Sequence, residues 1–422
     1  AMAANFSDLK AAQVKTVSFL TYLLRSFAEF LIPHQESVSA SVVNLLVTSP
    51  DSVAIRKELL VATRHVLATD FRRGFFSKID ILLNEKVLVG SGRACFDTLR
   101  PLAYSLLAEF IHHVRLELSL TQLSVIVYLF SRNVHDSSLP LSVQTTCVRL
   151  MLNLVESIFR RRGDEMDNVK GRALLGRILD SFVSKFGTLG HTVKQLHKEK
   201  LEKEAAAKAP AKDSGKTIES GKASGEGTSD GELILYLQNW QGPATKEMSD
   251  CKQLLRTLIM GMKTLLWSIT NFNRLTQQQA KDRTKTEVPP QNPLKGMSSE
   301  ELCISAGILK RGLPCLIIFD SKIHAEREIL DHFAAVFTVL ERRNFQDMFS
   351  LLMENLYNAI LKQESLICIP SSLIRFHNNG ISRHFSEVLA MFLVRDHLQD
   401  LHHPDTNRAT LTLKLFHIVI QL

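Results

Sequence analysis

The sequence contains few of the residues that break helices or cross-link small domains. Its 422 residues include only 12 Pro and 19 Gly, and its six cysteines are scattered with no CxxC pair. So few breakers favour helices over the short strands and turns of a sandwich or barrel. Scattered cysteines exclude a short disulfide framework and favour a reducing compartment. We therefore expect an all-α chain in the cytosol or nucleus.

Long apolar runs are also missing. The most apolar stretch, Leu254 to Ile269, is interrupted by Arg256 and Lys263, and a bilayer-spanning helix needs about 20 predominantly apolar residues. The first residues show no charged segment followed by an apolar core, which a secretory signal requires. We expect a soluble, unsecreted chain without contact to a membrane.

The charge balance is moderately basic. The chain carries 51 Lys and Arg against 43 Asp and Glu, a formal net charge of +8. A basic balance favours acidic partners such as activation domains or nucleic acid, but a mixed, solvated surface gives the same number. Both interpretations stay open at this point.

Apolar residues recur at helical spacing along most of the chain. The first stripe consists of Val17, Leu20, Leu24, Phe27 and Leu31, and similar stripes follow it. Helix pairs open near residues 12, 52, 98 and 142, a spacing of roughly 40 to 46 residues that is typical of HEAT and armadillo units. One pair cannot bury its apolar face alone, so neighbouring pairs must stack. The predicted fold class is an all-α solenoid of HEAT-like helical repeats.

Helix ends are marked by short local signals. Ser119 with Gln122, and Ser298 with Glu301, have the spacing of a capping box at a helix N-terminus. Pro101 fits the first turn of a helix, where its missing amide hydrogen costs nothing. These signals predict helices that begin near residues 101, 120 and 299.

The composition changes between residues 197 and 250. This stretch is rich in Gly, Ser, Lys and Glu, and it has almost no large apolar residue before Leu233. Such a segment cannot bury enough surface to offset the entropy lost on ordering. We expect HEAT-like repeats over 1–196, a disordered insertion over 197–250 and further repeats over 251–422, with a polar loop at about 271–297. Helical patterns that begin and end abruptly also predict a piece of a longer protein.

Residue patterns that carry chemistry are mostly missing. The adjacent pairs His112–His113 and His402–His403 point about 100° apart on a helix, so neither pair is suited to chelating one metal. The segment VLVGSGRACF, residues 87–96, lacks the residues of a phosphate loop, and an inter-helix turn that needs flexible backbone is the better interpretation. We expect no catalytic residue, no cofactor and no metal.

One basic run is the only candidate site. Arg160, Arg161 and Arg162 follow a predicted helix that ends near Phe159. Cations at a helix C-terminus interact favourably with the helix dipole, which explains the run without any ligand. The alternative is a patch for acidic activators or nucleic acid.

Several long stretches are similar to a known family. They include AQVKTVSFLTYLLRSFAEF, KVLVGSGRACFDTLRPLAYSLLAEFIHHVR, DCKQLLRTLIMGMKTLLWSI and EREILDHFAAVFTVLERRNFQDMFSL. They resemble the N-terminal HEAT region of the TRRAP family (transformation/transcription domain-associated protein), particularly its plant form. The resemblance covers nearly the whole chain apart from the two polar stretches.

The resemblance implies a role in transcription. Members of this family are very large proteins of the phosphatidylinositol-3-kinase-related class, with a HEAT solenoid, a FAT domain and a kinase-like domain lacking catalytic residues. They serve as activator-binding scaffolds of SAGA-type histone acetyltransferase complexes in the nucleus. The expected partners are therefore activators and complex subunits, with no small-molecule substrate and no direct nucleic-acid binding. Alternatives are another HEAT adaptor, such as a nuclear transport receptor or a phosphatase regulatory subunit, and an enzyme.

Overall fold

The computed structural model describes residues 2–161, 165–208, 243–283, 297–375 and 380–420. Within these residues the regular structure is helical and includes no strand. The chain divides into two compact units. The first unit contains Ala1–Lys185, Thr257–Ser305 and Val339–Asn344, and the second contains Phe186–Arg256, Ala306–Thr338 and Phe345–Leu422.

Helices follow one another along the described parts of the chain. The first half contains α1 (Met2–Ser26), α2 (Ala28–Leu31), α3 (Gln35–Thr48), α4 (Val53–Leu67), α5 (Arg72–Phe75), α6 (Ile79–Leu82), α7 (Glu85–Leu88), α8 (Arg93–Val114), α9 (Leu120–His135), α10 (Leu141–Arg160) and α11 (Glu165–Lys208). The second half contains α13 (Pro243–Arg283), α14 (Ser299–Leu316), α15 (His324–Val336), α16 (Arg342–Lys362), α17 (Cys368–Arg375), α18 (Ile381–Asp396) and α19 (Thr406–Ile420). The predicted all-α class is confirmed.

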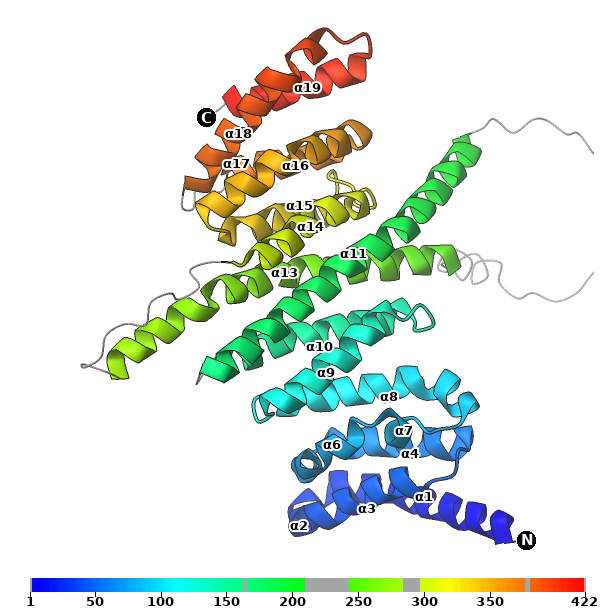
Figure 1. Ribbon diagram of the computed structural model, residues 1–422. Coiled ribbons are helices and arrows are strands. Elements are labelled where there is room, and N and C mark those ends of the chain that lie inside the picture. Colours follow the sequence, from blue (N-terminus) through cyan, green and yellow to red (C-terminus); the bar gives the residue numbers. More distant parts are fainter. Residues whose placement is uncertain (1, 162–164, 209–242, 284–296, 376–379, 421–422) are drawn as a thin grey trace, which may run out of the picture. The chain divides into compact units, whose positions relative to one another are not determined.

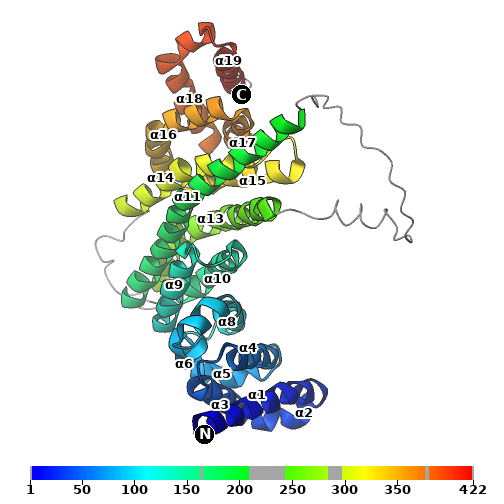
Figure 2. The same cartoon turned by 90° about the vertical axis from the view of Figure 1, so that its right-hand side faces the viewer.

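The first unit is built from two layers of helices. Figure 1 shows α4, α8 and α10 stacked one on the next, and these neighbours contact each other. Figure 2, turned by 90°, shows α6 and α9 in a second layer beside them. Fully buried rings fill the space between helices in this unit, among them Phe75, Phe110, Phe130 and Phe182. Stacked helix pairs therefore bury the apolar stripes that single pairs leave exposed.

Hydrogen bonds between neighbouring pairs repeat the spacing of the sequence pattern. Glu58 accepts a bond from Ser18, 40 residues earlier, and Arg64 pairs with Glu109, 45 residues later. In the second unit, Ser372 bonds to Asp331 across 41 residues. These separations match the period of roughly 40 to 46 residues that is typical of HEAT units.

Buried arginines tie the connections to the helices. Arg56 is 3% exposed. Its guanidinium donates to the carbonyls of Leu46 at 3.2 Å and Val87 at 3.0 Å, the first at the end of α3 and the second within α7. Gly90 follows α7 with φ +109°, and a Cβ there would lie 2.7 Å from an oxygen of Asp51. The predicted need for flexible backbone in this turn is therefore confirmed at Gly90.

Both predicted capping boxes are present. Ser119 accepts from the amide of Gln122, and the Gln122 side chain accepts from the amide of Ser119. Ser298 accepts from the Glu301 amide at 3.1 Å, and Glu301 accepts from the Ser298 amide at 2.8 Å. Local sequence therefore determines where α9 and α14 begin.

The predicted start at Pro101 is wrong. α8 begins at Arg93, and Pro101 lies inside it. Cys95 and Leu99, which precede the proline, are buried, and burying them on one helical face offsets the backbone bond that the proline removes. Between residues 72 and 88 the chain forms the short helices α5, α6 and α7.

Two helices extend into the predicted polar segments. α11 continues to Lys208 and α13 starts at Pro243, so residues 197–208 and 243–250 of the predicted insertion are helical. Residues 209–242 lie outside the described residues. Likewise, α13 continues through 271–283 of the predicted polar loop, and residues 284–296 are not described.

One ion pair in the first unit joins residues that are 129 positions apart. Arg172 of α11 donates two hydrogen bonds to Glu301 of α14, at 2.7 and 2.6 Å. Both side chains are nearly buried, with exposed fractions of 11% and 12%. Glu301 also closes the capping box with Ser298, so one carboxylate holds a helix start and a neighbouring helix together.

Replacing Arg172 by Ala is expected to destabilise the first unit by about 3–5 kcal/mol, because Glu301 would keep a nearly buried charge without its cation. Urea unfolding followed by far-UV circular dichroism measures the change. The matched control is Arg64→Ala, which removes a pair with Glu109 that is 51% and 41% exposed and should leave the midpoint unchanged. An unchanged midpoint for the Arg172 variant would contradict the assigned role.

A polar network closes the end of the second unit. His397 lies between two carboxylates, with Nδ1 2.7 Å from Asp400 and Nε2 3.1 Å from Glu354. Tyr357 donates to Asp400 at 2.8 Å, and Arg408 donates to the same oxygen at 2.8 Å. Partial burial by itself raises the pKa of Asp400, but hydrogen bonds from Arg408, His397 and Tyr357 outweigh it and lower this pKa from 3.8 to about 2.

Because of this network, the stability of the second unit is expected to change with pH in the acidic range. Because the pKa of Asp400 is lowered in the folded state, its contribution is complete above 3.8 and is lost as the pH falls through about 2. Asp400→Asn should lower the melting temperature at pH 7 and flatten its fall between pH 4 and pH 2. Glu364→Gln, which breaks an exposed pair with Lys414, should retain the wild-type profile. Parallel profiles for wild type and Asp400→Asn would refute the assignment.

Candidate docking surface

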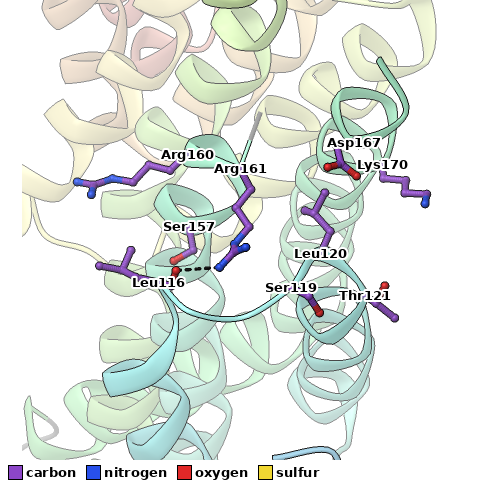
Figure 3. Close-up of a pocket in the computed structure, with 9 residues that line it drawn as sticks. All are labelled: Leu116, Ser119, Leu120, Thr121, Ser157, Arg160, Arg161, Asp167 and Lys170. Atoms are coloured by element: carbon purple, nitrogen blue, oxygen red, sulfur yellow. Dashed lines mark hydrogen bonds between the residues drawn. The ribbon is translucent and has the colours of Figure 1, made fainter. Parts of the chain in front are cut away.

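The predicted arginine run is at the C-terminal end of α10, where Arg160 and Arg161 have different partners. Arg160 is 63% exposed and pairs with Glu156 one turn earlier at 2.5 Å. Arg161 donates to the carbonyl of Leu116 at 2.8 Å. Figure 3 shows the two side chains pointing in different directions. Arg162 lies outside the described residues.

Aromatic residues surround the Arg160 end of α10. The ring of Phe159 lies 5.5 Å from that of Trp267 and 5.8 Å from that of Phe272, both on α13. Phe272 is fully buried, whereas Trp267 is 44% exposed. A tryptophan ring that is partly exposed beside a basic helix end is typical of protein interfaces, where Trp and Arg are enriched.

Further residues of α13 extend this surface. Met260 is 43% exposed, and it lies seven residues before Trp267, which places both on one helical face. Lys263 lies between them and is exposed. We refer to Phe159, Arg160, Met260, Lys263 and Trp267 as the Trp267 patch.

The opposite face of α13 explains why this one remains outside. This face carries a fully buried stripe that consists of Leu255, Leu258, Met262, Leu265 and Ile269. Gly261 lies against Leu152 of α10 so closely that a Cβ would be 2.2 Å from a Leu152 methyl carbon. This close approach brings Phe159 and Trp267 together.

Two glycines of α11 provide a test of how the aromatic cluster is packed. A Cβ on Gly171 would lie 2.8 Å from the Phe272 ring, whereas a Cβ on Gly176 would have no neighbour within 4 Å. Gly171→Ala should destabilise the first unit by about 1–3 kcal/mol through overpacking. Gly176→Ala should stabilise it by about 1 kcal/mol, because alanine favours the helix. Urea unfolding measures both, and shifts of the same sign would contradict this packing.

Arg161 lies in a cleft on the other side of the helix end. The cleft has a volume of about 660 Å³ and is lined by Leu116, Ser119, Leu120, Thr121, Ser157, Arg160, Arg161, Asp167 and Lys170. These residues come from the α8–α9 connection, the start of α9, the end of α10 and the start of α11 (Figure 3). Sequence reasoning identified only the arginines, because the other segments meet there only after stacking.

The other residues considered for chemistry have structural environments. The pKa of His112 is lowered by burial and by the nearby cations Arg115 and His113, and its Nδ1 lies 3.1 Å from the Asn153 amide. Burial, aided by Asp51, raises the pKa of the Cys95 thiol, which opposes an activated thiol. Among the described residues, no group of three or more His, Cys, Asp or Glu could hold a metal ion.

Among the helices that the structure describes, none combines the length and the apolar character that crossing a bilayer requires.

Stacked helix pairs with a repeat near 40 residues and an exposed interface-like surface define a helical-repeat protein of the HEAT type. The family model described as "Tra1 HEAT repeat central region" matches residues 5–421. The chain therefore belongs to the TRRAP/Tra1 family, as the resemblance predicted. The matching region is described as central, so the expected N-terminal placement is corrected.

Named relatives match nearly the whole chain. The probable transcription-associated protein 1 of Dictyostelium discoideum is 30% identical over 98% of this chain. The human transformation/transcription domain-associated protein is also 30% identical over 98% of the chain. The Saccharomyces cerevisiae SAGA complex/NuA4 acetyltransferase complex subunit TRA1 is 26% identical over 97%. The chain spans 9%, 11% and 13% of these relatives' lengths.

Proposed function

We propose that this chain is a non-catalytic scaffold segment of a nuclear TRRAP/Tra1-type subunit of histone acetyltransferase complexes. The observation that carries the proposal is the family match over residues 5–421. Support comes from relatives whose names place them in transcription or, in two yeasts, in the SAGA and NuA4 complexes. In this proposal the segment holds partners in place and the acetyltransferase subunits perform the chemistry.

The Trp267 patch is the proposed docking surface for acidic transcription activators. Trp267 and Met260 offer apolar surface, while Arg160 and Lys263 add positive charge beside it. A partner segment with alternating apolar and acidic residues complements both features. The apolar anchors would supply most of the affinity, and the charges would select and steer the partner. The formal net charge of +8 favours the same partners.

Membership in the complex is tested with the endogenous full-length protein. Affinity purification from nuclear extract should recover acetyltransferase subunits and acetylation of added histones. Recovery of the protein without any acetyltransferase subunit would overturn the scaffold proposal. Recovery with the GTPase of a transport receptor, or with a phosphatase catalytic subunit, would support the alternative HEAT adaptors instead.

The patch is tested separately by substitution in the full-length protein. Trp267→Ala combined with Arg160→Glu should weaken capture of an acidic activation segment by about tenfold or more, because it removes the apolar anchor and reverses the charge. Arg93→Glu is the matched control: Arg93 opens α8, its side chain is 96% exposed, and like Arg160 it pairs with a carboxylate one turn away on its own helix. Equal losses in both variants would indicate a general charge effect and contradict the patch.

A further inference from the structure

The cleft beside Arg161 combines three features that favour an anion. The first is the start of α9, a helix of 16 residues capped by Ser119. The cap satisfies the amide of Gln122, while the amides of Leu120 and Thr121 lie in the first turn, where the helix offers no acceptor. Free amides and the helix dipole together attract negative charge.

A buried hydroxyl without a partner is the second feature. Ser157 lines the cleft with an exposed fraction of 1%, and its Oγ makes no hydrogen bond. A serine inside a helix normally bonds to the carbonyl four residues earlier. A buried hydroxyl that stays unpaired has lost its hydrogen bonds to water without replacement. An anionic oxygen in the cleft would accept from this hydroxyl and restore a hydrogen bond.

The third feature is the arrangement of charge. Figure 3 shows Arg161 reaching towards the middle of the cleft, with Arg160 and Lys170 extending outward at opposite margins. Arg161 uses one nitrogen for the Leu116 carbonyl, and a guanidinium has further donors to offer. Asp167 is the single carboxylate in a lining that carries three cations, and one of these, Arg160, pairs with Glu156 outside the lining. The cleft therefore retains a positive excess of one charge.

The geometry points to a binding site for a phosphate monoester, carried as phosphoserine or phosphothreonine by a segment of a partner protein. Donors approach from the helix start, from Ser157 and from Arg161, which suits three phosphate oxygens better than the two of a planar carboxylate. A phosphate, with a charge of about −1.5 to −2, would also interact favourably with the nearby cations Arg161 and Lys170. The inference rests on the proposed scaffold function in one respect, which is that a partner protein carries the phosphate group.

The probe is N-acetyl-O-phosphoserine methylamide, observed by phosphorus NMR line broadening with the 422-residue chain. Wild type should broaden the signal in proportion to protein concentration. Arg161→Gln should abolish the broadening, and Ser157→Ala should reduce it at least threefold. Arg149→Gln, an exposed arginine of α10 outside the cleft, should behave as wild type.

Two results would overturn the site. One is wild type without broadening, and the other is equal broadening by wild type and Arg161→Gln. Inorganic phosphate is measured in parallel, and broadening of that signal alone would overturn the assignment to a phosphorylated segment. Competition by N-acetylglutamate methylamide at equal concentration would also overturn it, in favour of carboxylate. The full-length Arg161→Gln variant should still purify with the acetyltransferase subunits, because the scaffold proposal does not depend on the cleft. A failure of the anion site can therefore be distinguished from a failure of the scaffold proposal.

Discussion

No helix pair in this chain can bury its apolar stripe by itself, and the other features depend on that constraint. Each pair must stack on the next, so bonds between pairs recur at the repeat separation, as between Ser18 and Glu58. Buried arginines such as Arg56 then fasten the connections, because a guanidinium reaches several carbonyls at once. Stacking supplies the core, and these polar bonds determine the register of one pair on the next.

The same constraint explains the surface around α10. α11 contacts segments that come much later in the sequence. Arg172 of α11 pairs with Glu301 of α14, which lies 129 positions further along the chain. α13 then packs its buried face inward and presents Trp267 beside Phe159. The proposed docking surface therefore arises where α13 packs beside the end of α10, and the proposed anion cleft lies at the same helix end between consecutive elements.

Sequence alone predicted a large part of this fold. Stripes at helical spacing identified most helices. The capping boxes at Ser119 and Ser298 were predictable because their hydrogen bonds join residues only three positions apart. Pro101 was misplaced because tertiary burial of Cys95 and Leu99 overrides the local preference of proline. Arg160 and Arg161 of the predicted basic run lie about 100° apart around the helix end, and the run alone could not show which partners each side chain meets.

The sequence by itself determined the helical class, the repeat period and, through long similar stretches, the TRRAP/Tra1 family. These properties are local or cumulative, since each helix stripe and each matched stretch can be read without its neighbours. The tertiary structure alone decided that Phe159 meets Trp267 and that Ser157 lies unpaired beside Arg161. Phe159 and Trp267 are more than a hundred positions apart, and the cleft that contains Ser157 and Arg161 forms only when α9 and α11 pack around the end of α10.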